Sequence, residues 1–301
     1  MANQLAAQKP KFSMVIKSSV YQDLIRQTLG DPKKAERYTA AIMSAVATNP
    51  ALQECEARTI LSGSLLAESL NLAHSPQLGQ YYLVPFKNKK AGTTEAQFIL
   101  GYKGYLQLAI RSGNYKKINV MEIKEGELVS FNPFDEEIVL NPIQDVDERE
   151  AAKTIGYYAM FEYTNGFKKT IYWSKKQMLR HADRYSPAFS LNATKGKYPK
   201  VSFEDYEAGR YDKGDEWLYS SFWYKDFDGM AKKTMLRQII SKWGIMSVDM
   251  QQAFTFDNAV TDVSNGAFEV EQLPEDEPQE VPTTEEPKKQ ETPKAVNIDD
   301  L

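Results

Sequence analysis

The chain has 301 residues and an apolar fraction of 42%, which is enough to build the core of one large domain or two ordinary ones. Its one cysteine excludes an intramolecular disulfide, and with only two histidines we expect neither a structural metal nor a cofactor. No uncharged apolar run is long enough for a bilayer, and the start, MANQLAAQKPKFS, has no apolar signal core, so we expect a cytoplasmic protein without membrane contact.

The net charge of −4 conceals a segregation of charge along the chain. From residue 257 onward there are 13 acidic residues and three lysines, whereas residues 1–256 contain 34 basic and 28 acidic residues. A basic body with an acidic tail is typical of proteins that handle polyanions. Because the excess of positive charge in the body is modest, a polyanion-binding surface requires local clusters of bases.

The first part of the chain predicts an arm, three helices and a hairpin. Residues 1–17 are expected to be a flexible N-terminal arm. Between residues 18 and 72, apolar residues at helical spacing predict three packed helices, separated by breakers at 30–32 and 49–50. The segments YYLVPF (81–86) and QFILGY (97–102) are then typical of two hairpin strands.

The second part alternates strands and helices without a regular repeat. A short amphipathic helix follows the first hairpin, then strands near 115–124 and 127–131, and a protruding hairpin near 131–142. A further hairpin, 154–163 with 167–173, turns at Asn165-Gly166, a two-residue turn signal. Residues 174–184 predict a helix capped by Ser174, and residues 216–243 predict one or two helices with a break near Gly229.

These elements predict an α+β fold. N-terminal helices pack with a small antiparallel sheet and with a long basic C-terminal helix. Residues 257–301, rich in Pro, Glu, Thr and Gln, are expected to be a disordered acidic tail, because they cannot bury enough apolar area to offset chain entropy. The last residues, AVNIDDL, fit either a short docking peptide or a solvated end.

The segment 98–117, FILGYKGYLQLAIRSGNYKK, carries a row of donors on one face of its helix. Lys103, Gln107 and Arg111 follow each other at i, i+4 and i+8, while Tyr105, Leu106, Ala109 and Ile110 form an apolar arc. The row advances about 6 Å per step, which is the order of the phosphate spacing on an extended single strand. Three further bases around this segment are assigned to the same surface: Lys87, Lys116 and Lys117.

Charge imbalance and glycines support this interpretation. Between Ser69 and Met121 the chain has seven basic residues and one acidic residue, Glu95, whereas an ordinary solvated face mixes both signs. Glycines 101, 104 and 113 permit close backbone approach, and amides at the start of a helix can bind a phosphate. A merely solvated face remains the simpler alternative.

A second basic row occurs in DGMAKKTMLRQIISKWG. Lys233, Arg237 and Ser241 repeat the spacing i, i+4 and i+8, Lys232 stands beside them, and no acid occurs between Gly229 and Val248. The apolar arc of this helix is Met235, Leu236, Ile239, Ile240 and Trp243. Two rows of bases without acidic partners are expected to line one trough and share one polyanion.

Aromatic residues are interleaved with both rows, a combination that holds single-stranded nucleic acid. Most of these rings are expected in the core. We assign base contacts to Tyr102 and Trp223.

With these residues in view, the sequence resembles the RecT-type phage recombinases, which are ATP-independent single-strand annealing proteins. The resemblance covers roughly residues 20–250 and rests on NPALQECEARTILSGSLLAESLNL, GQYYLVPF, QFILGYKGYLQLAIRSG and MAKKTMLRQIISKWG. The segment AHSPQLGQ at 73–80 departs from the family pattern.

The resemblance implies a protein without bond chemistry that coats single-stranded DNA and pairs it with its complement in phage recombination. Residues 18–256 would form the DNA-binding and annealing domain, with Lys103, Gln107 and Arg111 facing DNA and Lys233 and Arg237 as groove partners. It also implies a homo-oligomer, as a ring or helical filament, in the cytoplasm of a bacterial host cell. A phage exonuclease and a host single-strand-binding protein are the implied partners, and the annealed duplex is the product.

Two other classes of function compete with this interpretation. Gly209-RYDK-Gly214 is a poor phosphate loop because Asp215 and Glu216 stand where Lys and Ser/Thr are required. A metal-dependent nuclease would need converging carboxylates, and Asp215, Glu216, Asp226 and Asp228 look like ordinary acids at helix starts. A passive single-strand coating protein without annealing activity stays open as the alternative.

Overall fold

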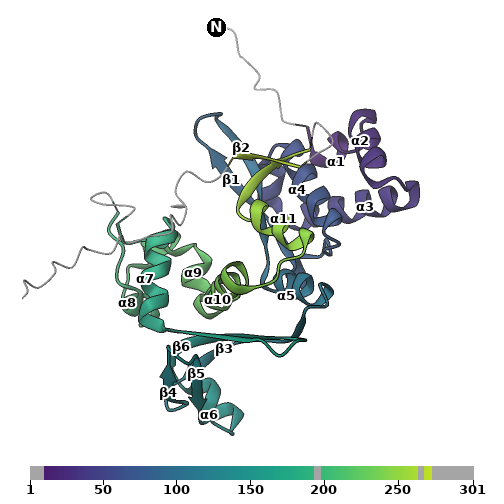
Figure 1. Ribbon diagram of the computed structural model, residues 1–301. Coiled ribbons are helices and arrows are strands. Elements are labelled where there is room, and N and C mark those ends of the chain that lie inside the picture. The colour runs from purple at the N-terminus through teal and green to yellow at the C-terminus, as the bar shows by residue number, and fades with distance from the viewer. Residues whose placement is uncertain (1–9, 193–197, 264–267, 273–301) are drawn as a thin grey trace, which may run out of the picture.

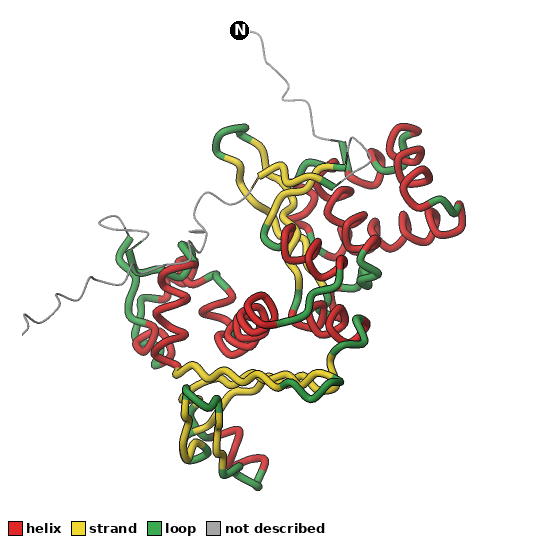
Figure 2. The backbone as a smooth tube through the Cα atoms, in the orientation of Figure 1, coloured by secondary structure: helices red, strands yellow, loops and turns green. Residues whose placement is uncertain are grey.

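The computed structural model of the protein describes residues 10–192, 198–263 and 268–272. It is an α+β fold with small antiparallel sheets, in agreement with the predicted class (Figure 1). One four-stranded sheet adjoins the N-terminal helices, and a three-stranded sheet lies at the other side of the molecule. Figure 2 shows this second sheet as a single layer with helices along one face.

Four helices make the N-terminal part: α1 (Phe12–Val15), α2 (Ser19–Leu29), α3 (Pro32–Thr48) and α4 (Ala57–Ser69), with a 3₁₀ turn η1 (Pro50–Glu54). The helix break predicted at residues 30–32 is present, because α2 ends at Leu29 and α3 begins at Pro32. Gly30 ends α2 in the left-handed region (φ 67°), and the Asp31 side chain accepts from Lys33 N (2.8 Å) at the start of α3. The three predicted helices are therefore confirmed.

The predicted N-terminal arm is too long. Phe12 and Ile16 are buried, because α1 places both side chains in the core that α2, α3 and α4 share. Residues 10–17 thus belong to the body, and residues 1–9 lie outside the described residues.

The first sheet has the order β1-β2-β8-β9. Its strands are β1 (Tyr81–Asn88), β2 (Thr93–Leu100), β8 (Ala259–Asp262) and β9 (Glu269–Gln272). The β1–β2 hairpin confirms the predicted pair. Strand β8 lies in the predicted tail, yet it pairs with β2 through Gln97↔Val260. The expected boundary at residue 257 is therefore wrong: residues 257–263 belong to the folded body, and residues 273–301 lie outside the described part.

The second sheet has the order β3-β6-β7, from β3 (Tyr115–Lys124), β6 (Thr154–Tyr163) and β7 (Lys168–Ser174). The hairpin β6–β7 is confirmed, but its turn has three residues, 164–166. Tyr163 N donates to Phe167 O (2.8 Å), and Gly166 has φ 89°, which is the geometry of a longer turn with a bulge. The predicted protruding hairpin is also present, as β4 (Leu128–Asn132) and β5 (Glu137–Leu140), followed by α6 (Val146–Ala151).

Helices cover one face of the second sheet. These are α5 (Tyr102–Arg111), α7 (Lys175–Tyr185) and α10 (Phe227–Trp243), with the shorter elements α8 (Phe203–Glu207), η3 (Lys213–Tyr219) and α9 (Phe222–Lys225) beside them. The predicted Ser174 cap is confirmed, and with Gln177 it forms a capping box. The break predicted near Gly229 lies at Asp226, whose side chain accepts from Gly229 N (2.9 Å) and caps α10.

Helix α10 is not the C-terminal element of the body. It has 17 residues, as many as α3, and is followed by α11 (Val248–Phe256), which the sequence analysis missed. Met250 and Ala253 of α11 are buried in the main core. Within the described residues, no helix is both long and apolar enough to span a bilayer.

Candidate nucleic-acid interface

Helix α5 begins directly after β2, and its glycines fit against the loop that precedes β1. A Cβ added at Gly101 would lie 2.1 Å from Gly79 O, and one added at Gly104 would lie 2.1 Å from Gln80 O. Gly101 N also donates to Gln80 O (2.9 Å). These glycines therefore do permit a close backbone approach, as predicted, but the group that approaches them is the protein's own backbone at residues 79–80. Their presence says nothing of a bound phosphate.

The predicted donor row lies on the outer face of α5. Lys103, Gln107 and Arg111 are all exposed, while Tyr105 and Ala109 are fully buried on the opposite face. The predicted apolar arc needs one correction. Ile110 is 61% exposed beside the row, and Leu108 is the residue that fills the core.

Arg111 is held in place by the end of helix α4. Its guanidinium donates to Leu70 O (2.5 Å) and Asn71 O (3.1 Å), and it lies 4.0 Å from the Asp249 carboxylate. A cation at the C-terminal end of a helix compensates carbonyls that have no helical partner. Arg111 thus fixes one end of the donor row. Lys103, at the other end, is exposed and less constrained than Arg111.

The second row was expected to lack acidic partners, and this expectation is wrong. Lys233 Nζ lies 3.8 Å from one oxygen of Asp257, and Arg237 lies 3.4 Å from the other. Asp257 is buried between these cations and α5, where it also accepts from Leu100 N (2.8 Å) and Tyr105 OH (2.6 Å). A buried carboxylate requires such compensation. The sequence pattern does not reveal this partner, because Asp257 is the first residue of the segment expected to be the acidic tail.

The trough predicted between the two rows is therefore not formed by two sets of unpartnered bases. Tyr105 points from α5 toward Asp257 and the α10 cations, whereas the donor row faces the other way. Lys233 and Arg237 hold the body together beneath α5, and their predicted role in the groove remains untested.

The other assigned bases are distributed over the neighbouring strands. Lys87 on β1 and Lys117 on β3 are exposed. Lys116 pairs with Glu162 across the sheet (2.5 Å), and Lys232 pairs with Glu122 (3.2 Å). Surface pairs of this kind are weak and exchange readily with another anion.

The two assigned rings are not equivalent. Tyr102 is half-buried against the main core. Trp223 is only 7% exposed and packs on Phe189 and Phe227 (ring centroids 6.1 and 5.2 Å apart). In this structure the Trp223 ring is part of the core and not of a stacking surface.

Helix α7 carries a basic row that the sequence analysis missed. Lys176, Arg180 and Arg184 are exposed and stand at i, i+4 and i+8, the spacing that singled out α5. Beside them three half-buried rings follow each other: Trp173 to His181 (5.3 Å between centroids) and His181 to Tyr185 (4.6 Å). The signal is present in KKQMLRHADRY, because a helix is predicted there and its bases recur at i, i+4 and i+8.

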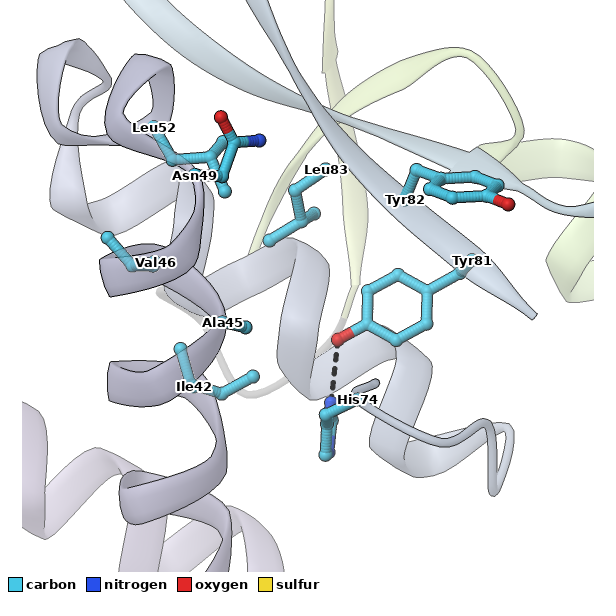
Figure 3. A pocket seen from close by; sticks show the side chains of 9 residues that line it. All are labelled: Ile42, Ala45, Val46, Asn49, Leu52, His74, Tyr81, Tyr82 and Leu83. Carbon is cyan, nitrogen blue, oxygen red and sulfur yellow. Dashed lines mark hydrogen bonds between the residues drawn. The ribbon is translucent and has the colours of Figure 1, made fainter. Parts of the chain in front are cut away.

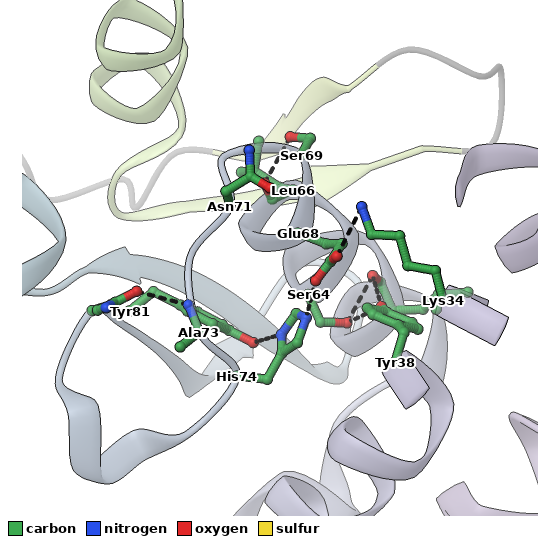
Figure 4. A network of polar contacts seen from close by, with 12 residues as sticks. Lys34, Tyr38, Ser64, Leu66, Glu68, Ser69, Asn71, Ala73, His74 and Tyr81 are labelled. Atoms are coloured by element: carbon green, nitrogen blue, oxygen red, sulfur yellow. Dashed lines mark hydrogen bonds and ion pairs between the residues drawn. The ribbon is translucent and has the colours of Figure 1, made fainter. Parts of the chain in front are cut away.

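A polar network holds the loop that touches α5 (Figure 4). Lys34 Nζ pairs with Glu68 (3.0 Å), His74 Nε2 lies 2.6 Å from the other Glu68 oxygen, and His74 Nδ1 lies 2.6 Å from Tyr81 OH. Burial would raise the pKa of Glu68, but Lys34 and His74 outweigh it and lower that pKa. Burial lowers the pKa of His74 and raises that of Tyr81. A neutral His74 that donates to Glu68 and accepts from Tyr81 satisfies all three groups.

His74 and Tyr81 also line a small cavity of about 70 Å³ between α3 and β1 (Figure 3). Its other walls include Ile42, Val46 and Leu83. The cavity is too small and too apolar for a nucleotide. The segment 73–80, where the sequence departs from the family pattern, contacts α5 through Gly79 and Gln80 and so supports this helix.

Two of the four carboxylates that a nuclease would need, Asp226 and Asp228, have structural roles. Asp226 caps α10, and Asp228 accepts from Tyr157 OH (2.6 Å) and Thr154 (3.1 Å). No group of three or more His, Cys, Asp or Glu that could hold a metal ion occurs among the residues that the structure describes.

Exposed basic rows on α5 and α7, the second of them beside three half-buried rings, are typical of nucleic-acid-binding proteins. The model of the RecT family matches residues 36–272, and the chain therefore belongs to the RecT family. This match confirms the resemblance found in the sequence and includes β8 and β9 in the family domain.

Two relatives are similar to this chain over most of its length. "Uncharacterized protein YqaK" of Bacillus subtilis (strain 168) is 37% identical over 263 residues, which cover 86% of this chain and 78% of the relative. "Protein RecT" of Escherichia coli (strain K12) is 26% identical over 226 residues, which cover 74% and 71%, respectively. Membership in the family indicates single-stranded DNA binding and strand annealing in recombination as the general function.

Proposed function

We propose that this protein is an ATP-independent annealing protein that binds single-stranded DNA along the outer face of α5 and pairs it with its complement. The observation that carries this proposal is the exposed row Lys103, Gln107 and Arg111, on a helix that a close glycine contact and Arg111 hold in place. Its steps of about 6 Å suit successive phosphates of an extended strand. The exposed bases of β1, β3 and α7 would extend the same surface: Lys87, Lys117, Lys176, Arg180 and Arg184.

The mechanism needs no bond chemistry. Pairing and stacking release about 1.4 kcal/mol per base-pair step, so the barrier to annealing is repulsion between strands and the folding of each strand on itself. A surface that contacts phosphates lowers the repulsion through counterion release and leaves the bases free to pair. Contacts to the backbone alone accept any sequence.

We further propose that subunits line up along DNA as a ring or helical filament, and that the setting is phage recombination in a bacterial cell. A phage exonuclease would supply the single strand, and a host single-strand-binding protein would be displaced from it. Family membership supports this setting.

The deciding experiment separates annealing from passive coating. Complementary labelled oligonucleotides are mixed with the protein, without nucleotide, and duplex formation is followed by fluorescence. We expect faster duplex formation than without protein. Slower pairing, with binding intact, would favour the passive coating protein, and shortening of a labelled strand with magnesium or manganese would indicate a nuclease.

A further inference from the structure

Strand β1 carries an exposed tyrosine ring close to the start of helix α5. Tyr82 is 43% exposed, and Figure 3 shows its ring pointing away from His74, whereas the neighbouring Tyr81 points toward His74. Among the described strands β1 is at the edge of the first sheet, so the ring has a cross-strand neighbour, Ile99, on one side only. A flat ligand can therefore reach the ring from solvent.

The Tyr82 ring and the Lys103 side chain meet above Gly79. A Cβ added at Gly79 would lie 3.1 Å from the Tyr82 hydroxyl oxygen and 3.7 Å from Lys103 Cδ. Gly79 has φ 62°, a left-handed conformation that favours glycine, so this point is left without a side chain. The cation at the start of the donor row and an accessible ring thus form one continuous surface.

A cation beside an accessible ring can hold both parts of one nucleotide. The ammonium group contacts the phosphate, while the face of the ring stacks on the base. Tyr82 is more accessible than the two rings that were assigned to base contacts from the sequence, since Tyr102 is half-buried and Trp223 is buried. The start of α5 is therefore the place where the donor row and an exposed ring occur together.

We propose that Tyr82 is the base-stacking residue of the single-strand site, and that its ring holds the base of the nucleotide whose phosphate contacts Lys103. This inference rests on the proposed function, because it adds a base contact to the same surface. Stacking accepts any base, since every base has a π-face. One stacked base at the start of the row fixes the position of the strand along α5, and the bases beyond it stay free to pair.

The test compares two ligands that differ only in their bases. One is an oligothymidylate, and the other is a strand of the same length built from abasic sites, which keeps the phosphates. We expect Tyr82→Leu to bind the oligothymidylate about tenfold more weakly than the wild type does, as for loss of one stacked base. On the abasic strand the two proteins should have nearly equal affinity. Lys103→Glu should bind both ligands more weakly, because it loses a phosphate contact.

Two further variants show whether the ring itself is responsible. Tyr82→Phe keeps the face of the ring and should restore most of the affinity that Tyr82→Leu loses. Phe134→Leu is the matched control, since Phe134 is 93% exposed on the β4–β5 hairpin, which projects from the second sheet (Figure 1). This control should bind both ligands like the wild type. Tyr82 and Phe134 are exposed, so all three variants are expected to fold, which circular dichroism checks.

Three results would overturn the proposal. The first is wild-type affinity of Tyr82→Leu for the oligothymidylate. The second is an equal loss on both ligands, which would show that Tyr82 positions the loop or α5 without contact to a base. The third is a Tyr82→Phe protein that binds as weakly as Tyr82→Leu.

Annealing is measured on the same proteins, so that this inference and the proposed function are tested separately. A base-dependent loss in Tyr82→Leu, together with a wild type that does not accelerate pairing, would contradict the annealing function alone. Accelerated pairing by the wild type, together with an affinity that does not depend on Tyr82, would contradict the base contact alone.

Discussion

Asp257 contacts three elements in the central part of the molecule. Its carboxylate joins the end of β2 through Leu100 N, α5 through Tyr105, and α10 through Lys233 and Arg237. Removal of the buried charge from such a cluster costs far more than loss of an exposed ion pair, because the charge–charge contacts around it are shielded from solvent.

We expect Asp257→Asn to lower the free energy of unfolding by about 3 kcal/mol, because the buried carboxylate no longer supplies its charge to the contacts with Lys233 and Arg237. Urea denaturation measures the change. The matched control is Asp262→Asn, whose ion pair with Arg58 is partly exposed and should cost about 1 kcal/mol or less. Equal effects of the two substitutions would show that the Asp257 cluster has no special role.

The network at His74 predicts a dependence of stability on pH. The folded-state pKa values of His74 and Glu68 are both lowered, so the unfolded chain binds protons more readily than the folded chain. Stability from His74 is complete above its ordinary pKa near 6.5 and declines as the pH falls below it; stability from Glu68 declines below about 4.5.

Accordingly, the free energy of unfolding should be smaller at pH 5 than at pH 7, and His74→Gln should reduce this difference because the variant has no imidazole to protonate. Thermal or urea unfolding at both values provides the measurement. An unchanged pH dependence in the variant would place the responsible groups elsewhere.

At the scale of elements, α5 owes its position to contacts with the loop before β1. Gly104 lies so close to Gln80 O that any side chain must displace the helix or the loop. The donor row lies on the outer face of the same helix. A change in the packing of α5 against the loop would therefore also move the row that is proposed to bind DNA.

We expect Gly104→Ala to destabilise the protein by roughly 1–3 kcal/mol, as overpacking does, and also to weaken DNA binding by moving the row. Gly214→Ala is the control, since its Cβ would meet only Asp212 at 3.4 Å. Calorimetry and a binding titration measure the two effects. A Gly104→Ala protein as stable as the control would contradict the close contact.

Local signals explain what could be predicted from the sequence. The helix starts at Asp31-Pro32 and at Ser174 depend on contacts within three or four residues, so the sequence alone places them correctly. The partner of Lys233 and Arg237 could not be found in that way, because Asp257 lies in a segment with the composition of a tail. Its contacts with Leu100 and Tyr105 span 157 and 152 residues. The α7 row, by contrast, can be predicted from the spacing of its bases alone.

At the scale of the whole molecule, the last described strands close the first sheet. Strand β8 lies between β2 and β9, and Asp257 precedes it. The body therefore extends to residue 272, where the family match also ends.

Truncation after Gln272 should leave the melting temperature nearly unchanged, whereas truncation after Phe256 should prevent stable folding, because it removes Asp257 and the inner strand β8. Calorimetry of the two shortened proteins measures the difference. Equal melting temperatures would show that β8 and Asp257 contribute little to the body.

The central claim is that the outer row of α5 contacts a phosphate chain, and the salt dependence of single-strand binding in Lys103→Glu tests it most directly. The control is Lys153→Glu. Lys153 is also exposed, but it adjoins Thr154, which pairs with Lys124 at the end of β3 remote from α5. We predict weaker binding for Lys103→Glu and a slope of log affinity against log salt that is shallower by about 0.7 for each lost contact, with the control unchanged. A slope equal to that of the wild type would contradict the claim.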